Sequence, residues 1–380
     1  MDVFHLAEIF ELKDVPSVRA GRVNAIVTCY NEALRLPYFL KFYQCLGVEQ
    51  LIVIDNGSTD ASGEILDAHP LVTRIYTTKP YKQYKSIWRE ALANQFFAHR
   101  WVIFPDIDEL LVYPGWPDRD IAWLISYLEA SGYDALFTPM VDMYPSEPLS
   151  ELYYEPGESF IEACPYFDVG NYRLAPQNTK RWQTPPYRLQ GGARERLFHR
   201  GKDREPTWAD RLLLRLFFSP KRNVAPKRKW QEWQARALQR LDGCFPDNPP
   251  NMSKVPLLRW RPGTRLPGGP HRWNFEYRLG SDWGSLLHFK YLQDFPSKVE
   301  EAVSRQQHMG GAAFYKIYRE QLQDTAARSL MFSGSKRFTG YRSLLNAGLM
   351  RASKALRQEL RLQASREGTS SSTLTLTKKM

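Results

Sequence analysis

The stretch EQLIVIDNGSTDASGEILDAH, residues 49–69, contains the pattern that decides the fold. Its first part (49–58) is an apolar run of Ile, Leu and Val that ends at Asp55 and an Asn-Gly turn, which predicts a buried strand followed by a turn. Its second part has the spacing of a short helix, with Thr59 or Asp60 as the residue that caps it. A buried strand that turns directly into a helix is one βα unit.

The same unit recurs on both sides of this stretch. Three further apolar runs predict strands: RVNAIVTC (22–29), LVTRIYTT (71–78) and RWVIFPDID (100–108). Two amphipathic runs predict helices: EALRLPYFLKFYQCLG (32–47), with a Gly to end it, and YKQYKSIWREALANQFFAH (81–99). Strands that alternate with helices over short links predict an α/β fold, Rossmann-like, with a mostly parallel sheet flanked by helices. Ligands of such sheets bind outside the carboxyl ends of the strands.

This alternation weakens after about residue 140. Residues 144–187 are rich in Pro, Tyr and Asn and predict long ordered loops with short strands, whereas SLLHFKYLQDF (285–295) and the helical pattern at 297–324 are regular. We expect four parts: an N-terminal extension (1–21), a first sheet half (22–140), a second half that completes the domain (141–332), and a basic helical segment with a disordered tail (333–380).

Charge divides the chain in a similar way. Of 380 residues, 43% are apolar, enough for a sizeable core, and the net charge is +11. Residues 1–150 hold 12 Lys/Arg and 20 Asp/Glu, whereas residues 151–380 hold 40 and 21. The basic part suits phosphate groups, an anionic membrane surface or an acidic polymer.

Compartment signals are weak. No run of 18 apolar residues exists, so we expect no transmembrane helix. The acidic start of the chain lacks the features of a secretory signal. The four cysteines are widely spaced, which implies neither a disulfide framework nor a zinc site. We therefore expect a cytoplasmic location.

The run FPDIDELLVYPG (104–115) places three carboxylates, Asp106, Asp108 and Glu109, directly after the apolar run WVIF (101–104). Carboxylates this close repel one another, and confining them costs free energy unless a positive charge lies among them. A solvated strand end or a helix cap is one interpretation, and a cation site is the other.

The end of the run at 49–58 allows two interpretations as well. A buried Asp55 followed by a turn and a helix start suits hydrogen bonds to a base or ribose, and the helix start suits an anion. Alternatively, Asp55 and Asn56 only make the turn, and the segment 58–60 only caps the helix.

Three segments together resemble a known family. They are TCYNEALRLPYFLKFYQCLGVEQLIVIDNGSTDASGEIL (28–66), KSIWREALANQFF (85–97) and WVIFPDIDELLVYPG (101–115). They are similar to nucleotide-sugar glycosyltransferases of the GT-A fold, in glycosyltransferase family 2, and more narrowly to a bacterial branch with N-E-A, D-N-G-S-T-D and D-x-D-E-[FL]-L motifs. The similarity covers roughly residues 22–140, and a weaker similarity is present at 191–198 and 286–295.

In that family the D-x-D carboxylates hold a divalent cation that bridges the two phosphates of the sugar nucleotide. The resemblance implies that Asp108 is the principal metal ligand and that Asp106 serves metal-bound water, ribose or the donor sugar. Carboxylate and phosphate oxygens suit Mg²⁺ or Mn²⁺, which would act as a Lewis acid on the leaving diphosphate. Glu109 would cap a helix, support the site or bind the metal directly.

The resemblance also implies a nucleotide-sugar-binding set at the ends of the first two predicted strands: Thr28, Tyr30, Glu32, Asp55, Asn56 and Ser58. Asp55 would face the base. Lys82, Lys85 and Arg89 lie along one predicted helix and would either meet phosphate or form a solvated face.

An inverting enzyme needs a general base for the acceptor hydroxyl. GGARERLF (191–198) offers Glu195, a partial match because Arg196 follows it. Alternatively, Glu195 only pairs with Arg194 or Arg196, and Asp282 is the base.

Two elements near the C-terminus remain. His288, in LLHFK, matches a late histidine that would bind metal or phosphate, although a buried histidine is the ordinary alternative, and His271 is its rival. The segment 341–363 has leucines among Arg and Lys residues, which fits either a helix on an anionic membrane or a helix packed on its own domain.

We therefore expect a metal-dependent, inverting hexosyltransferase that moves a sugar from a nucleotide-diphosphate sugar to a glycan or lipid-linked acceptor, in cell-surface polysaccharide synthesis. Peripheral contact with the inner face of a membrane is expected, and nucleic acid is not an expected partner. One alternative is a non-catalytic basic module that binds nucleic acid or acidic polysaccharide. Another is a nucleotidyltransferase, which would normally have a Gly-rich basic loop after the first strand.

Overall fold

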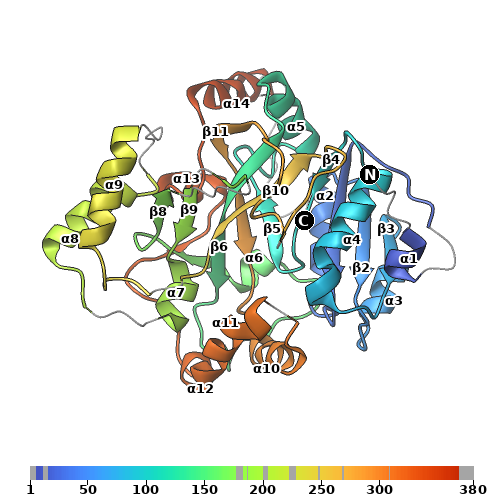
Figure 1. Cartoon of the computed structure of the whole chain (residues 1–380), viewed down its shortest axis with the longest axis horizontal. Helices are drawn as coiled ribbons and strands as arrows, with labels where there is room; N and C mark the ends of the chain where they lie inside the picture. Colours follow the sequence, from blue (N-terminus) through green and yellow to red (C-terminus); the bar gives the residue numbers. More distant parts are fainter. Residues whose placement is uncertain are drawn as a thin grey trace.

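Figure 1 shows a central sheet with helices on both faces and a helical lobe at one end. The computed structural model describes residues 6–11, 16–176, 183–185, 187–199, 204–221, 228–246, 249–267, 269–307 and 309–367. The fold is α/β and Rossmann-like, as predicted for a GT-A architecture.

The N-terminal half is the predicted series of βα units. Its elements are β1 (Val23–Cys29), α2 (Leu36–Leu46), β2 (Gln50–Asp55), α3 (Ser62–Asp67), β3 (Val72–Tyr76), α4 (Tyr81–Phe96) and β4 (Trp101–Ile103). Strands β4, β1, β2 and β3 are neighbours in that order, and all three pairings are parallel. All six residues of β2 are buried, as expected of a strand covered by helices on both faces.

Local chemistry explains where these helices begin and end. Helix α2 ends at Gly47, whose positive φ of 96° is the left-handed conformation that glycine adopts without strain, as predicted. It begins at Leu36, four residues later than predicted, beside Pro37. The N-cap position of α3 is Ala61, one residue after the predicted Asp60, but the side chain of Asp60 accepts the backbone N–H of Ser62, the first residue of the helix, and also that of Ala33.

The fourth strand is shorter than predicted. β4 ends at Ile103, and the chain turns through residues 104–108 before β5 (Glu109–Val112) begins. Pro105 has no backbone N–H to donate to a neighbouring strand, which favours the end of the ladder at this point. The turn places Asp106 and Asp108 at the carboxyl end of β4.

The second half continues the same sheet, mainly with antiparallel strands. The longest strand, β6 (Ala135–Tyr144), pairs with β10 (Ser253–Arg259), which in turn pairs antiparallel with β4. The order across the sheet is β13-β7-β6-β10-β4-β1-β2-β3, so the sheet is mixed, with its parallel part in the N-terminal half. The predicted boundary at residue 140 falls inside β6; the division into parts stays a prediction.

One strand from the C-terminal part of the chain brings distant site residues together. β12 (Ser285–His288) lies between β5 and β6, antiparallel to the first and parallel to the second. Its register places His288 opposite Glu109 of β5 and opposite Asp142 of β6. Three ionisable residues from distant parts of the chain therefore share one edge.

The central sheet also contains β7 (Tyr166–Asp168), β11 (Leu279–Trp283) and β13 (Ser335–Arg337), and β8 (Arg173–Pro176) and β9 (Tyr187–Gln190) form a separate two-stranded sheet. The remaining helices are α1 (Leu6–Phe10), α5 (Ile121–Ala130), α6 (Phe160–Ala163), α7 (Gly192–Phe198), α10 (Phe295–Arg305), α11 (Met309–Glu320), α12 (Leu322–Ala326), α13 (Tyr341–Ala347) and α14 (Lys354–Glu367). The short strands and long loops predicted for 144–187 are present, except that residues 177–182 and 186 lie outside the described residues.

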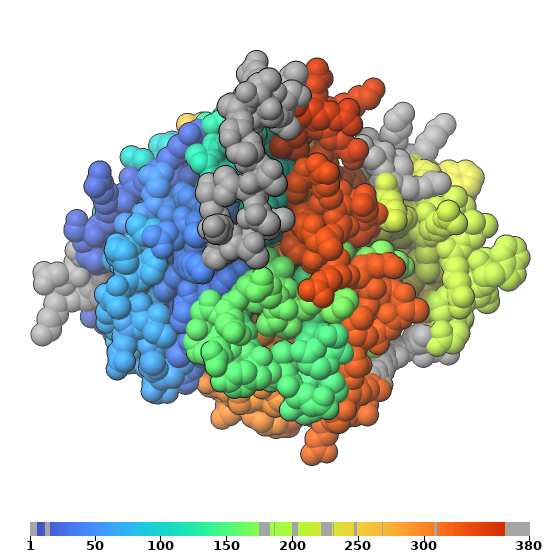
Figure 2. Space-filling model, turned by 180° about the vertical axis from the view of Figure 1, so that it is seen from behind, coloured from blue at the N-terminus to red at the C-terminus, as the bar shows by residue number. Residues whose placement is uncertain are grey.

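A helical lobe projects from the sheet. It comprises α8 (Trp208–Leu213), the π-helical turn η1 (Leu214–Phe218) and α9 (Arg228–Arg240). It has its own small apolar cluster of Phe218, Ala237, Leu241 and Cys244. Figures 1 and 2 show this lobe at one end of the molecule, away from the N-terminal half.

The C-terminal segment 341–363 is two helices rather than the single one predicted. α13 stops at Gly348, whose φ is 79°, and α14 starts six residues later. Leu344, Leu349 and Leu356 are buried against the protein, which favours the interpretation of a segment packed on its own domain. Among the described residues, no helix has the length and apolar character needed to cross a bilayer. None of the four cysteines forms a disulfide.

Candidate active site

Asp106 lies between two cations. Its Oδ1 accepts a hydrogen bond from Arg89 of α4 (3.0 Å), and its Oδ2 accepts one from the ammonium of Lys254 of β10 (2.7 Å). Burial alone would raise its pKa, but Lys254 and Arg89 hold the pKa of this carboxyl well below its usual value. Its side chain nevertheless remains 42% exposed, so it keeps a face toward solvent.

Glu109 stabilises the turn at 104–108 from its buried side. Its fully buried carboxylate accepts hydrogen bonds from Lys254 (2.5 Å) and from the backbone N–H of Asp106 (3.0 Å). Burial raises the pKa of Glu109 against the attraction of Lys254. Because Glu109 begins a strand and faces away from solvent, its contacts are those of a supporting residue and not of a helix cap.

Asp108 begins a chain of polar contacts that runs inward. Its Oδ2 lies 3.1 Å from Nε2 of His288, and Nδ1 of His288 lies 2.7 Å from Oδ1 of the fully buried Asp142. Arg194 donates to the same Asp142 oxygen (2.6 Å). Burial would lower the pKa of His288, but the neighbouring Asp108 and Asp142 raise it. The electrostatics of this site therefore favour a positive charge beside Asp108.

The distance between Asp108 and His288 tests their fit to a divalent cation. Two ligands on adjacent octahedral corners, each about 2.1 Å from Mg²⁺, lie about 3 Å apart, close to the 3.1 Å observed. A carboxylate on the other ring nitrogen, here Asp142, is the usual outer partner of a metal-binding histidine. No group of three or more His, Cys, Asp or Glu side chains in the described part of the chain forms a ready-made metal site. The pair fits a cation whose other ligands are phosphate and water oxygens.

The first loop lies where the sequence predicted, at the carboxyl end of β1. Thr28 accepts a hydrogen bond from Arg89 (3.1 Å), the same guanidinium that contacts Asp106. The ring of Tyr30 is covered by Arg305 of α10, whose guanidinium carbon lies 3.2 Å from the ring centroid. Arg305 also donates to the side chain of Asn56 (3.3 Å). The end of α10 thus covers the predicted nucleoside side of this loop.

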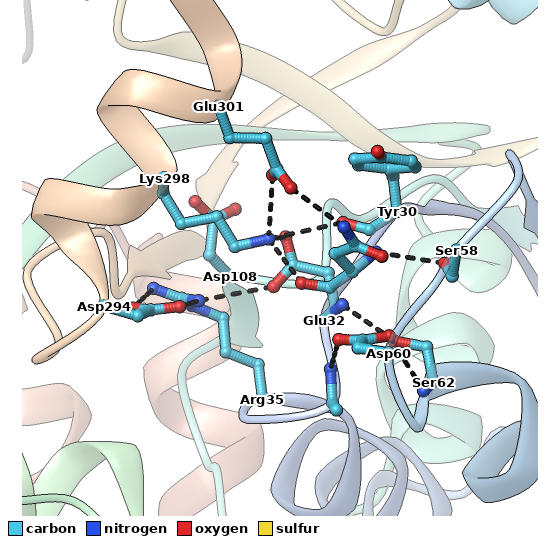
Figure 3. Close-up of polar contacts among 12 residues, drawn as sticks. Tyr30, Glu32, Arg35, Ser58, Asp60, Ser62, Asp108, Asp294, Lys298 and Glu301 are labelled. Atoms are coloured by element: carbon cyan, nitrogen blue, oxygen red, sulfur yellow. Dashed lines mark hydrogen bonds and ion pairs between the residues drawn. The ribbon is translucent and has the colours of Figure 1, made fainter.

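Ion pairs fasten α10 to the same loop (Figure 3). Lys298 donates to the carbonyl of Asn31 (2.5 Å) and to Glu32 (3.0 Å). Arg35 binds Asp294 through two hydrogen bonds of 2.5 and 2.7 Å and also contacts the second oxygen of Glu32 (3.3 Å). Both oxygens of Glu32 are therefore engaged by protein cations in this conformation.

Asp55 lies at the end of β2, as predicted, but it is fully buried. Its Oδ1 accepts the backbone N–H of Ser58 (2.9 Å), and its Oδ2 pairs with Arg74 (2.7 Å). Ser58 in turn accepts the N–H of Asn31, and Asn56 donates to the carbonyls of Thr77 and Lys79. These contacts fit the turn interpretation, and nucleoside contact by this group stays a prediction.

The three basic residues predicted along α4 differ in burial and in their contacts. Arg89 is buried at Asp106, whereas Lys82 is exposed at the start of the helix. Lys85 lies over the Tyr81 ring (5.3 Å), and its pKa is lowered by burial and by repulsion from Arg89 and Lys254. Lys85 therefore belongs to a cationic cluster around Asp106.

Neither candidate base is free. Glu195 makes a bidentate pair with Arg173 (2.6 and 3.0 Å) and accepts the N–H of Gly191. Glu195 therefore forms a salt bridge, but its partner is Arg173 and not Arg194 or Arg196, which bind Asp142 and Asp168; its role as a base stays a prediction. Asp282 accepts hydrogen bonds from Tyr127 and from the backbone of Ser353.

His271 lies near the cations instead of near His288. Its Nδ1 contacts the carbonyl of Ser253 (2.7 Å), and burial together with Lys254 lowers its pKa to about 4.

Lys254 and Asp142 were not among the residues predicted from the sequence. Both are charged residues inside otherwise apolar strands, SKVPLLRW and PMVDMY. A charged side chain at a buried strand position almost always has an oppositely charged partner, and this was the available signal.

Comparisons with known proteins add little. No family model matches the sequence, and no curated protein matches it. Solved structures give partial matches. One is a mycobacterial protein, with a TM-score of 0.23 and 18% identity over 32% of this chain and 41% of that one. A second is the glucosyl-3-phosphoglycerate synthase of Mycobacterium tuberculosis in complex with phosphoglyceric acid, with the same TM-score and identity over 32% and 43%.

A third match is the inositol-1-phosphate CTP transferase of T. maritima, with a TM-score of 0.22 and 12% identity over 45% of this chain and 69% of that chain. The matched part thus spans about two-fifths of the length of the first two structures. At these TM-scores the matches support no conclusion about function.

Proposed function

We propose that this chain is a metal-dependent glycosyltransferase that moves a sugar from a nucleoside diphosphate sugar to a glycan or lipid-linked acceptor. The observation that carries the proposal is the turn at 104–108, where Asp106 and Asp108 keep solvent-facing carboxylates at the carboxyl end of β4. This is the edge of an α/β sheet at which ligands bind.

The residues around the turn suit a diphosphate. Lys85, Arg89 and Lys254 gather near Asp106, beside the buried imidazole of His271, and burial together with repulsion from Arg89 and Lys254 lowers the pKa of Lys85. Cations confined in this way are stabilised by an anion that enters among them. A phosphate group would add negative charge to that of Asp106 and Glu109, the two carboxylates that Arg89 and Lys254 already contact.

Asp108 and His288 would hold Mg²⁺ or Mn²⁺, with Asp142 fixing the imidazole. The bound cation would supply Lewis-acid stabilisation of the charge on the leaving diphosphate. Arg89 and Lys254 orient Asp106 and add fixed positive charge to the same place.

We do not assign the acceptor base to Glu195 or Asp282, because both carboxylates are held by hydrogen bonds. Inversion and retention differ in the configuration of the new glycosidic bond, which is read from the anomeric proton of the product by NMR.

The first test is binding. The melting temperature is measured with UDP, GDP, CDP and dTDP, each with Mn²⁺ and with EDTA. One nucleotide should raise it far more with the metal than without. The control for the variant Asp108→Asn is Asp324→Asn. Asp324 is an exposed aspartate on α12, and this control should respond to nucleotide and metal like the parent protein.

The second test is turnover, as release of the nucleoside diphosphate from a panel of nucleotide sugars. If no nucleotide shows synergy with the metal and no sugar nucleotide is consumed, the proposal fails. Binding of acidic polysaccharide without either effect would favour the basic binding module.

A further inference from the structure

The helical lobe exposes large apolar side chains that no part of the described structure covers. Among the described residues, Trp208 is 80% exposed, Trp233 59%, Leu212 47% and Leu238 39%. They lie on α8 and α9. The lobe's own apolar cluster includes Phe218 of η1 and Ala237 of α9, so on α9 the exposed Trp233 and Leu238 flank the buried face. Large apolar groups gathered on one small element mark an interaction surface more often than chance exposure.

The exposed positions follow helical spacing. On α8 and the start of η1, Trp208, Arg211, Leu212 and Arg215 are all exposed at intervals of three and four residues, and so lie on one face. On α9, Trp233 and Arg236 are exposed three residues apart. Each helix therefore presents aromatic or aliphatic groups together with arginine.

This surface has surplus positive charge. Residues 200–240 hold 12 Lys/Arg and 4 Asp/Glu. Ion pairs in the lobe join Arg204 and Arg240 to Asp210. Within the described residues, Arg211, Arg215 and Arg236 have no acidic side chain at ion-pair distance. Their charge is available to a partner outside the chain.

We propose that this helical lobe docks on a lipid bilayer with anionic headgroups. Arginines attract such a surface, tryptophan rings prefer the headgroup region, and leucines enter the acyl boundary. A soluble polyanion would use the arginines and could stack on the rings, but it offers nothing apolar to Leu212 and Leu238. Docking by this lobe differs from docking by 341–363, where the leucines are buried, and it does not depend on the proposed transfer reaction.

The test is co-sedimentation of the full chain with vesicles. Neutral vesicles are phosphatidylcholine alone, and anionic vesicles contain about one third phosphatidylglycerol. Wild type should sediment with anionic vesicles, with a blue shift of tryptophan emission, and should dissociate at high salt. Trp208→Ala/Trp233→Ala should weaken binding about tenfold. Arg211→Gln/Arg215→Gln/Arg236→Gln should weaken it about a hundredfold.

Two control variants lie outside the lobe. Tyr153→Ala removes an exposed aromatic ring, and Lys336→Gln/Arg337→Gln removes exposed positive charge. Both should bind vesicles like wild type. All variants change exposed side chains, and unchanged melting temperatures would show that they fold.

Four results would overturn the proposal. They are no binding to anionic vesicles, equal binding to neutral vesicles, full binding by the lobe variants, and binding of heparin without binding of vesicles. Concentration-dependent dimerisation through the lobe, without vesicle binding, would assign the surface to a second copy instead.

Discussion

At the end of β2, Asp55 is fully buried, and both of its oxygens accept hydrogen bonds from nearby residues, Ser58 and Arg74. In the turn after β4, Asp106 has two cationic partners and still keeps a side chain that is 42% exposed. One partner, Lys254, comes from 148 residues away. Both aspartates lie at or just after the end of a buried parallel strand, yet the first is enclosed by its turn and by Arg74 of β3, whereas the second keeps an exposed face.

The difference shows what separates a structural carboxylate from one available to a ligand. A fully buried carboxylate whose oxygens are both paired within the protein is out of reach of another molecule, whereas a partly exposed one among cations can exchange contacts when an anion or metal arrives. The strand end alone does not distinguish the two. The surroundings that later segments supply decide it.

The largest effect should come from removing the cation shared by the turn. Lys254→Met leaves Asp106 and the buried Glu109 without their common partner. We expect a loss of about 3–5 kcal/mol in the free energy of unfolding, measured by urea denaturation. Lys336→Gln, on the exposed β13, is the control and should change it little. A stable Lys254→Met protein would mean that the turn does not depend on its distant partner.

Asp108→Asn tests the functional side of the comparison. The change keeps size and removes the charge beside His288, so metal-dependent turnover should fall by about 10²–10³-fold or more while the melting temperature changes little. Turnover at saturating Mn²⁺ and the melting temperature are measured on one preparation. Near wild-type turnover would remove Asp108 from the metal site.

Glu195→Gln extends the comparison to a third carboxylate. Because Glu195 is paired with Arg173, which is buried, we expect a loss of about 2–3 kcal/mol in the free energy of unfolding. The shape of the pH–rate profile should not change. A fall in turnover of about 10²–10⁴-fold, with the acid limb gone, would instead identify Glu195 as the base.

Asp55→Asn tests directly whether Asp55 has only a structural role. Loss of the charge opposite the partly exposed Arg74 should cost about 1–2 kcal/mol of stability. If Asp55 serves only the turn, nucleotide affinity, measured by calorimetry in the presence of Mn²⁺, should stay within about twofold. A large loss of affinity at unchanged stability would place Asp55 at the nucleoside.

The smallest expected effect is a change in the pKa of His288. Asp108 is the main cause that raises the pKa of His288, so Asp108→Asn should lower the pKa of His288, as followed by NMR in metal-free buffer. A raised pKa in the folded state stabilises the protein below the unfolded value of about 6.5, and this contribution is lost as pH rises through the folded pKa. The variant should therefore show less of this pH dependence. An unchanged pKa would contradict the assigned contact.

Local patterns in the sequence were sufficient to predict the parallel half of the fold. The apolar runs, the Asn-Gly turn and Gly47 each act over a few residues, so β1 to β4 and their helices are where expected. The end of β4 at Ile103, two residues before Pro105, and the break at Gly348 had visible local signals that the apolar periodicity outweighed.

The site was only partly predictable, because its contacts depend on strand register. The acidic turn and His288 could be identified from the sequence, but their neighbours Lys254 and Asp142 are set by how β10, β12 and β6 align. The spacing and composition of residues in the sequence do not determine how these strands align. Glu195 resembled a base, but the bidentate contact with Arg173 is a tertiary event that local sequence does not show.

The position of β12 has a consequence for how the protein is made. This strand pairs with β5, yet the ribosome adds His288 long after Glu109. At about 5–20 residues per second the interval is roughly 10–35 seconds, during which the nascent chain has a gap between β5 and β6. Arrest of translation within that interval should yield a protease-sensitive chain without nucleotide affinity, and release after β12 should yield a resistant one.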